Sequence, residues 1–318
     1  DPNNFNKYIK DGNLLELQCM NFYDQSWFDI DCVFQSAGYG HLHICKWLKD
    51  IGFDLGYYDT MNSAVSSGNF ELVKWLNSEI KLKPGQFAVN TAASRGYFEI
   101  LKWIKENKIG PLPDQDGMDW ATRNCHIEII EWIRDNTDCI LNQLAIDLSA
   151  SRGTKLFEWL KKNNSEQKPT IEAMKYACNN LETFKWLHEK MGFIPTQDIA
   201  NYTCLYDNVP LLDWIKHNFS LLPDKQGIIN AMHKHHINVF KWLKQNCNWI
   251  PHQNQLDIIY IYGQLEIIKW LKEEKLLILT EENIIALISH RRYAALTWLQ
   301  EQNIIYFVNG EHKLVKEN

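Results

Sequence analysis

The sequence lacks the long apolar runs that a membrane span requires. No stretch of about 18 consecutive apolar residues occurs among the 318 residues, so we expect no transmembrane helix and no membrane partner. An excess of basic residues is also missing, because 33 Lys and Arg oppose 39 Asp and Glu, which gives a net charge of −6. Dedicated nucleic-acid-binding domains are usually strongly basic, so this composition disfavours nucleic acid as a partner.

The motifs of common catalytic and cofactor sites are absent as well. The sequence contains no phosphate-binding loop, no dinucleotide-binding Gly-x-Gly-x-x-Gly, no His-Glu-x-x-His and no Gly-x-Ser-x-Gly. We therefore expect neither an enzyme nor a bound cofactor.

The eight cysteines include no Cys-x-x-Cys pair, and their spacing matches no disulfide or metal framework. This usage favours a reducing compartment, and we expect a cytoplasmic protein. One metal-like cluster combines His233, His235 and His236 with Cys247 and His252. Structural zinc requires four converging ligands, so we interpret these residues as exposed polar side chains and predict no metal site.

Tryptophan, in contrast, is abundant, and ten of the 13 tryptophans recur at a fixed period. Successive members of this tryptophan column are 27 to 29 residues apart, and each is followed by Leu or Ile; they are Trp47, Trp75, Trp103, Trp132, Trp159, Trp186, Trp214, Trp242, Trp270 and Trp298. A fixed period of roughly 20–50 residues indicates a solenoid, a propeller or another array of repeats.

The residues around each column tryptophan have helical periodicity. Apolar residues recur five, three and two places before the tryptophan and one place after it, as in Leu265, Ile267, Ile268 and Leu271 around Trp270. Glu and Lys three residues apart mark the opposite, solvated face, in the pairs Glu71/Lys74, Glu99/Lys102, Glu182/Lys185 and Glu266/Lys269. We interpret the tryptophans themselves as buried structural residues that stack along the array.

A second helix is predicted before each of these segments. A small residue eleven places before the tryptophan suits close packing, at Ala64, Ala92, Ala121 and Ala231. Glycine seven places before it can end this first helix in the left-handed conformation, at Gly40, Gly68, Gly96 and Gly263. Other repeats have Asn179 or Asp207 there, which tolerate that conformation, or Cys125, His235 and Arg291, which suit it less. Proline nine or ten places after the tryptophan ends the connection, and a following Thr or Asp can cap the next helix.

These patterns predict one continuous all-α solenoid of about eleven stacked helix-loop-helix repeats over residues 1–318. A tryptophan-free copy that begins at Gly12, with Cys19 in place of the tryptophan, forms an N-terminal capping repeat at 1–29, and ten tryptophan-containing repeats occupy 30–300. Residues 301–318 form a C-terminal cap, in which Asn309-Gly310 between two strand-like runs predicts a β-hairpin. We interpret Cys19, Cys45 and Cys178 as small buried hydrophobic residues.

The segment small-x-x-Gly-x-Leu-Glu-Ile-x-Lys-Trp-Leu, represented by Gly263–Leu271, resembles the second half of an ankyrin repeat. The likeness extends over nearly the whole chain and is greatest to the short, tryptophan-containing ankyrin-like repeats of giant DNA viruses and protists. The chain departs from ordinary ankyrin repeats in its period, which is near 28 rather than about 33 residues, and in lacking the Thr-Pro-Leu-His opening of the first helix.

The resemblance implies short or absent β-hairpin fingers and a non-enzymatic scaffold that binds a protein partner on its concave face. A viral adaptor or host-interaction protein is one form of this function. A structural component of a large particle is the alternative, and a nucleic-acid-associated protein is a second one.

The binding surface is expected where the repeat columns vary. The columns eight and twelve places before the tryptophan share a helical face, and the columns eight and nine places before it contain no acidic residue. We therefore predict a neutral-to-basic strip with Tyr and Arg as anchors. We further expect Trp120 to be exposed and Trp249 to be buried. The predicted partner-binding residues are Tyr39, Arg95, Trp120, Arg123, Tyr202, Tyr206, His233, Lys234, Tyr262 and His290.

Overall fold

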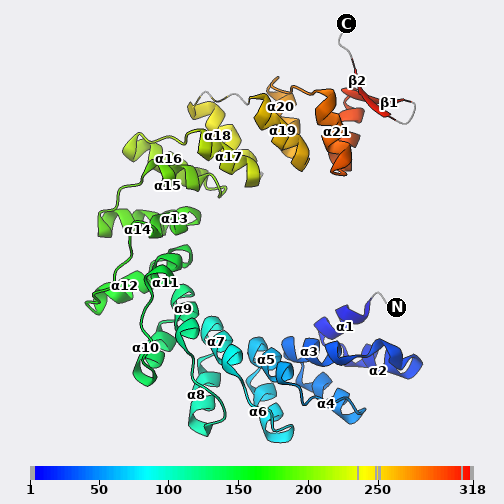
Figure 1. Cartoon of the computed structure of the whole chain (residues 1–318), viewed down its shortest axis with the longest axis vertical. Helices are drawn as coiled ribbons and strands as arrows, with labels where there is room; N and C mark the ends of the chain where they lie inside the picture. The colour runs from blue at the N-terminus through cyan, green and yellow to red at the C-terminus, as the bar shows by residue number, and fades with distance from the viewer. Residues whose placement is uncertain (1–3, 235, 248, 250–251, 309–310, 316–318) are drawn as a thin grey trace. The chain divides into compact units, whose positions relative to one another are not determined.

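The chain is an all-α solenoid built from pairs of short helices (Figure 1). The computed structural model describes residues 4–234, 236–247, 249, 252–308 and 311–315. By internal contacts the chain divides into two compact units, Asp1–Thr170 and Ile171–Asn318. Each unit is a stack of helix pairs, so the predicted repeat architecture is confirmed in both.

Unit 1 contains six of these pairs, each with a first helix and a second helix. Their bounds are α1 Phe5–Asp11 with α2 Leu14–Tyr23, α3 Ile30–Gly38 with α4 Leu42–Asp50, α5 Tyr58–Ser67 with α6 Phe70–Glu79, α7 Gln86–Arg95 with α8 Phe98–Asn107, α9 Gln115–Arg123 with α10 Ile127–Asn136, and α11 Gln143–Leu148 with α12 Lys155–Lys162. Two 3₁₀ turns accompany them, η2 Gln25–Trp27 and η3 Ser149–Arg152, the latter continuing α11.

Unit 2 contains five pairs. They are α13 Ala173–Tyr176 with α14 Leu181–Met191, α15 Gln197–Thr203 with α16 Val209–Phe219, α17 Lys225–Lys234 with α18 Ile237–Cys247, α19 Gln253–Tyr262 with α20 Leu265–Glu273, and α21 Glu281–Ser289 with α22 Tyr293–Glu301. The 3₁₀ turn η4, Ala177–Asn179, continues α13. The eleven pairs within the described residues match the predicted number of repeats.

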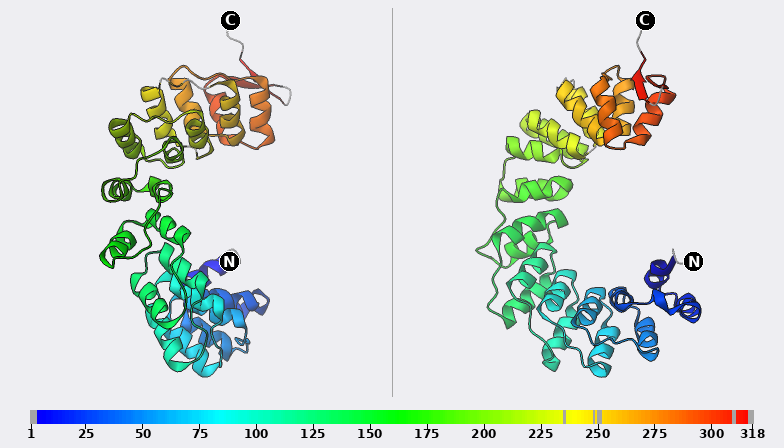
Figure 2. Two further views of the ribbon diagram at one scale, coloured as in Figure 1. Left: turned by 60° about the vertical axis from the view of Figure 1, so that its left-hand side comes forward. Right: turned by 45° about the vertical axis from the view of Figure 1, so that its right-hand side comes forward.

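First helices pack against the first helices of neighbouring pairs within each unit, as the two views of Figure 2 show. In unit 1, α3 contacts α5, α5 contacts α7 and α7 contacts α9, and in unit 2, α15 contacts α17 and α19 contacts α21. The alanines eleven places before the tryptophans lie in these contacts and are fully buried: Ala64, Ala92, Ala121 and Ala231. A small side chain at that place lets the helices approach closely, as the sequence predicts.

The core lies between the layers of first and second helices. In all ten tryptophan-containing repeats, the residues three and two places before the tryptophan and one place after it are at most 4% exposed. Leu72, Val73 and Leu76 are one such triplet, and each is completely buried. Removing apolar side chains from water is the dominant favourable term in folding, so these triplets supply most of the stability of a repeat.

The tryptophans are less buried than predicted. Only Trp242 and Trp270 are buried, each 4% exposed, whereas the other eight members of the column are half-buried. Members of the column contact side chains of the preceding repeat: the ring centroids of Phe70 and Trp103 lie 5.7 Å apart, and the Lys49 ammonium lies 5.6 Å from the Trp75 ring. The tryptophans therefore form a seam at the surface along the second helices, and the prediction of a fully buried column is wrong for eight of them.

The turn between paired helices follows the predicted glycines. Gly40, Gly68, Gly96 and Gly263 have φ values of 78°, 77°, 81° and 61°, which is the left-handed conformation. Cys125 and Arg291 also adopt it, with φ of 60° and 56°. His235 lies outside the described residues.

Asn179 and Asp207 do not adopt the left-handed conformation, contrary to expectation. In their repeats the chain leaves the first helix through hydrogen bonds between residues three apart, such as the Tyr206 N–H to the Thr203 carbonyl at 3.1 Å. This tighter exit needs no left-handed residue.

Helix starts also follow the sequence. Asp114, directly after Pro113, accepts a hydrogen bond from the Asp116 N–H at 3.0 Å, and Asp224, directly after Pro223, accepts one from the Gln226 N–H at 2.8 Å. The solvated face of the second helices bears the predicted ion pairs, with N–O distances of 2.5 Å in Glu71–Lys74 and 2.8 Å in Glu266–Lys269.

A polar ladder ties neighbouring repeats together at the ends of the first helices. The side chain six places before the tryptophan reaches back to a carbonyl of the preceding first-helix end: in unit 1, His41 Nε2 lies 3.0 Å from Lys10 O, Asn69 Nδ2 donates to Gly40 O at 2.7 Å and His126 Nε2 lies 2.9 Å from Ser94 O. In unit 2 the same contact links Asn208 to Cys178 O, His236 to Leu205 O, Gln264 to Met232 O and Arg292 to Ile261 O. The last carbonyls of a helix lack intrahelical donors, so this ladder satisfies them and fixes the surface around them.

The predicted C-terminal hairpin is present. β1 (Ile305–Val308) pairs antiparallel with β2 (Glu311–Leu314), and they are the only strands in the described part of the chain. The Asn309-Gly310 turn itself lies outside the described residues. Ile305 is buried against the core of unit 2, so the hairpin covers the apolar end of the last helix pair.

Candidate binding hollows on the first-helix surface

The predicted binding residues concentrate in two hollows, one in each unit, at the C-terminal ends of the first helices. We call the exposed side chains at these helix ends the first-helix surface. Three predicted residues of unit 1, Arg95, Trp120 and Arg123, line one hollow. Three predicted residues of unit 2, Tyr202, Tyr206 and Lys234, line the other.

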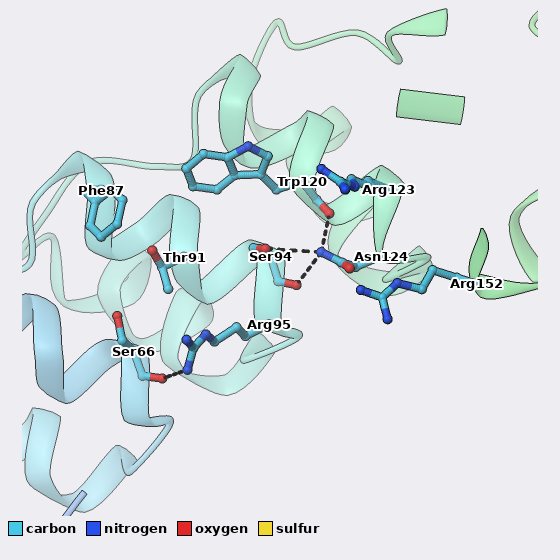
Figure 3. Close-up of a pocket in the computed structure, with 9 residues that line it drawn as sticks. All are labelled: Ser66, Phe87, Thr91, Ser94, Arg95, Trp120, Arg123, Asn124 and Arg152. Atoms are coloured by element: carbon cyan, nitrogen blue, oxygen red, sulfur yellow. Dashed lines mark hydrogen bonds between the residues drawn. The ribbon is translucent and has the colours of Figure 1, made fainter. Parts of the chain in front are cut away.

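The unit 1 hollow, hereafter the arginine hollow, has a volume of about 440 Å³ and combines two aromatic rings with three arginines (Figure 3). Arg95 comes from the last turn of α7, Arg123 from the last turn of α9 and Arg152 from η3. Phe87 and Trp120 form one edge, with ring centroids 6.3 Å apart in an edge-to-face arrangement. No acidic side chain lines this hollow.

The floor of the arginine hollow is held by the first-helix ends themselves. Asn124 Nδ2 lies 3.1 Å from the Ser94 carbonyl, 3.2 Å from the Ser94 hydroxyl and 3.0 Å from the Trp120 carbonyl (Figure 3). Arg95 Nη1 donates to the Ser66 carbonyl at 2.5 Å. Arg123 and Arg152 are exposed, and neither guanidinium pairs with any group in the part of the chain that the structure describes.

The unit 2 hollow, hereafter the tyrosine hollow, is larger, at about 750 Å³, and close to neutral. Lys234 supplies one positive charge and Asp207 one negative charge, and the Asp207 carboxylate accepts a hydrogen bond from Asn238 Nδ2 at 2.5 Å. The rings of Tyr202 and Tyr206 lie 6.1 Å apart. Burial raises the pKa of Tyr206 to about 12, so its phenol remains a hydrogen-bond donor at neutral pH.

Three predicted site residues line neither hollow. Tyr39, Tyr262 and His290 are exposed at the ends of α3, α19 and α21, and the His290 ring hydrogen-bonds to the Ala286 carbonyl of its own helix. His233 lies in α17, and its side chain is outside the described part. Two tryptophans outside the column also had a predicted burial. Trp249 is buried as predicted, at 7% exposed, whereas Trp120 is half-buried rather than exposed.

Two lining residues of functional character were missed by the sequence reasoning. Arg152 stands seven rather than eight places before its tryptophan because this repeat is one residue shorter, so it fell outside the chosen columns. Phe87 lies at the start of α7, outside the columns of variable residues, and is 58% exposed. The rarity of arginine is a signal that could have found Arg152.

The buried cysteines Cys45, Cys178 and Cys204 have no environment that would activate them. Burial raises the pKa of Cys45, Cys178 and Cys204 to about 12, so these thiols stay protonated. Cys45 and Cys178 are buried as predicted, but Cys19 is exposed on α2, which corrects the expectation that it fills a core position.

The described residues contain no group of three His, Cys, Asp or Glu side chains placed to hold a metal ion. His235, one member of the histidine cluster, is not among them. No described helix is both long enough and apolar enough to cross a membrane.

No protein-family model and no curated protein matches this chain. Among solved structures, it is similar to two crystal structures of the pentatricopeptide repeat protein PPR10 in complex with an 18-nt psaJ RNA element. Each match has 10% sequence identity and a TM-score of 0.39, and covers 93% of this chain and 53% of that chain. The chain thus spans about half the length of these structures, and a similarity of this degree identifies neither a family nor a ligand.

Proposed function

We propose that this chain is a non-enzymatic scaffold of ankyrin-like repeats that binds a protein partner on its first-helix surface. The proposal is carried by one observation: each unit has a hollow at the same place in the repeat, lined by residues of the variable columns. The core triplets are alike from repeat to repeat, whereas the hollows differ in charge and shape. Variation confined to one surface is typical of repeat proteins that bind partners.

The residue types in the hollows support a protein partner. Trp, Tyr and Arg are the residues that most often dominate the binding energy of protein interfaces. Five of the residues that line the hollows are of these types: Arg95, Trp120, Arg123, Tyr202 and Tyr206. The second helices α6, α8, α14 and α20 are less suited to this role, because each of them has exposed charges engaged in a local ion pair, such as Glu71–Lys74.

A photo-crosslinking experiment tests the choice of surface. The photoreactive amino acid p-benzoylphenylalanine replaces Trp120 or Tyr206 on the first-helix surface, and Glu71 or Glu182 on the second helices as matched controls. In extracts of the native source, we expect the variant at Trp120, the variant at Tyr206 or both to crosslink to one protein. We expect neither control variant to crosslink to it. Equal crosslinking from Glu71 and Glu182, or crosslinking to nucleic acid in place of protein, would overturn the proposal.

A further inference from the structure

The arginine hollow gathers a rare residue. The chain has six arginines against 27 lysines, and half of the arginines, Arg95, Arg123 and Arg152, line this one hollow. The planar guanidinium forms two parallel hydrogen bonds to a carboxylate or a phosphate, which the lysine ammonium cannot do. The presence of three guanidinium groups around one hollow therefore indicates recognition of anionic oxygens.

The three arginines of this hollow form no ion pair with any described residue. Arg95 donates to the Ser66 carbonyl, but its guanidinium has further donors. Arg123 and Arg152 have no partner among the described residues, and every other lining side chain is neutral. A single basic residue in the last turn of a helix offsets the partial negative charge of the carbonyls there. That effect does not explain three arginines around one hollow, because the first helices α5 and α19 end without any basic residue.

The repeat geometry limits the shape of the anion. The three arginines come from three successive repeats, and packed helices lie roughly 8–10 Å apart. A peptide in the extended polyproline II conformation has three residues per turn and rises about 3.1 Å per residue, so side chains three residues apart lie on one face about 9 Å apart. A chain laid across the first helices would thus present every third residue to the next arginine.

We propose that the arginine hollow binds an extended acidic segment of a protein partner in which carboxylate side chains recur at every third residue. This inference rests on the proposed function, since it specifies what the first-helix surface binds in unit 1. The carboxylates pair with Arg95, Arg123 and Arg152 in turn. The Trp120 indole N–H, which has no acceptor in the described chain, is available at the edge of the hollow to the backbone of the segment.

Fluorescence anisotropy of labelled peptides against the full chain tests the inference. The spaced peptide repeats Asp-Gly-Ser three times, and the clustered peptide has the same composition with its three aspartates consecutive. A single-stranded oligouridylate is the third probe. We expect the spaced peptide to bind about tenfold more tightly than the clustered one, because only the former reaches all three arginines. Equal affinities of the two peptides, or tighter binding of the oligouridylate, would overturn the inference.

Variants of the hollow connect this binding to the arginines. Arg123→Glu with Arg152→Glu should weaken binding of the spaced peptide about a hundredfold, and Arg123→Lys with Arg152→Lys should weaken it several-fold, because lysine keeps the charge but loses the paired hydrogen bonds. Lys161→Glu with Lys162→Glu is the control: these exposed lysines of α12 line neither hollow, and reversing them changes the net charge equally. An equal loss in the control would attribute binding to net charge and refute the inference.

The two proposals fail separately. If the spaced peptide does not bind but Trp120 still crosslinks to a protein, the acidic-segment inference is wrong and the scaffold function stands. If neither position on the first-helix surface crosslinks to a protein and the peptide does not bind, both are wrong. Circular dichroism melts of every variant confirm that it is folded before it is compared.

Discussion

The arginine hollow and the tyrosine hollow occupy the same place in the repeats of their own units, yet they offer different chemistry. The first has three arginines and no acidic residue, and the second has two tyrosines and one charge of each sign. Both rest on first-helix ends held by the same ladder contact, His126 to Ser94 O in unit 1 and His236 to Leu205 O in unit 2. The scaffold is therefore separable from the recognition chemistry, and side chains at a few places per repeat decide what is bound.

The difference between the hollows also separates two kinds of binding energy. Exposed arginines act through charge, which is screened by salt and mainly accelerates association. The tyrosines act through buried aromatic area and a protonated phenol, which salt affects little and which mainly slow dissociation. The comparison can be tested first at the level of the scaffold and then at the level of the hollows.

The largest expected effect concerns the tryptophan column, which is half-buried throughout unit 1 but buried at Trp242 and Trp270 of unit 2. Trp242→Ala should reduce the free energy of unfolding by about 3–5 kcal/mol, because it leaves a cavity and deprives Asp213 of the indole donor at 2.6 Å. Trp75→Ala should cost about 1–2 kcal/mol, since part of that ring is in water already. Denaturant melts followed by circular dichroism, with hydrogen exchange to locate the destabilised unit, measure both. Equal losses would mean that exposure does not set the contribution of this column.

The tryptophans show which features of the fold could be predicted from the sequence and which could not. Their period predicted the helix pairs and the number of repeats, because periodicity reveals which residues share a face. It does not reveal how much of that face a neighbour covers. Lys49 over Trp75 and Phe70 beside Trp103 are contacts between repeats, and they cover only part of each ring. The buried triplets beside the tryptophans were predictable because the chain itself covers them within one repeat.

The candidate site was predictable in part for a similar reason. The column eight places before the tryptophan led to Arg95, Tyr206 and Lys234, which lie in the hollows. Arg152 was not found, because one deleted residue shifted it out of the column. Tyr39 and Tyr262 were included by their column although neither lines a described hollow, since hollows depend on the sizes of side chains in adjacent repeats and not on one repeat alone.

Salt dependence should separate the two hollows. For the protein captured by photo-crosslinking, Arg123→Glu with Arg152→Glu should weaken binding about 10- to 100-fold, or about 1.4–2.8 kcal/mol, mostly through slower association. That loss should shrink as the salt concentration rises from about 0.05 to 0.5 M. Tyr202→Ala with Tyr206→Ala should weaken binding by a similar factor, mostly through faster dissociation and equally at all salt concentrations. Surface plasmon resonance gives both rates, and identical salt profiles for the two double variants would remove the distinction between the hollows.

The residue that ends the first helices also differs between the units. Left-handed glycines follow α1, α3, α5 and α7 in unit 1, whereas in unit 2 only Gly263 does so, and the next repeat has Arg291 at φ 56°. Gly263→Ala should destabilise unit 2 by about 1–2 kcal/mol, because the left-handed conformation is costly for alanine and its Cβ would lie 2.6 Å from the Arg292 side chain. Arg291→Gly should stabilise it by about 0.5 kcal/mol, since the strain outweighs the added freedom of the unfolded chain. Chemical denaturation of both variants checks the opposite signs, and two changes of the same sign would contradict them.

The smallest expected effect is a pH dependence of unit 1 at the ladder contact beneath the arginine hollow. Burial lowers the pKa of His126 below its ordinary value near 6.5, and the charges of Lys155 and Arg152 lower it further, while the hydrogen bond to Ser94 O acts in the opposite direction. Between that ordinary value and the lower folded pKa, the unfolded chain binds more protons than the folded chain does. The stabilising contribution is therefore complete above about pH 6.5 and is lost as the pH falls through the folded pKa of His126.

His126→Asn removes this titration and should preserve the contact, because Asn69 makes the same bond two repeats earlier, to Gly40 O at 2.7 Å. Thermal melts between about pH 7.5 and 5.5 should show nearly equal stability of the two proteins at the upper limit and a smaller loss for His126→Asn on acidification. An unchanged pH profile in the variant would show that His126 does not contribute to the acid sensitivity of unit 1.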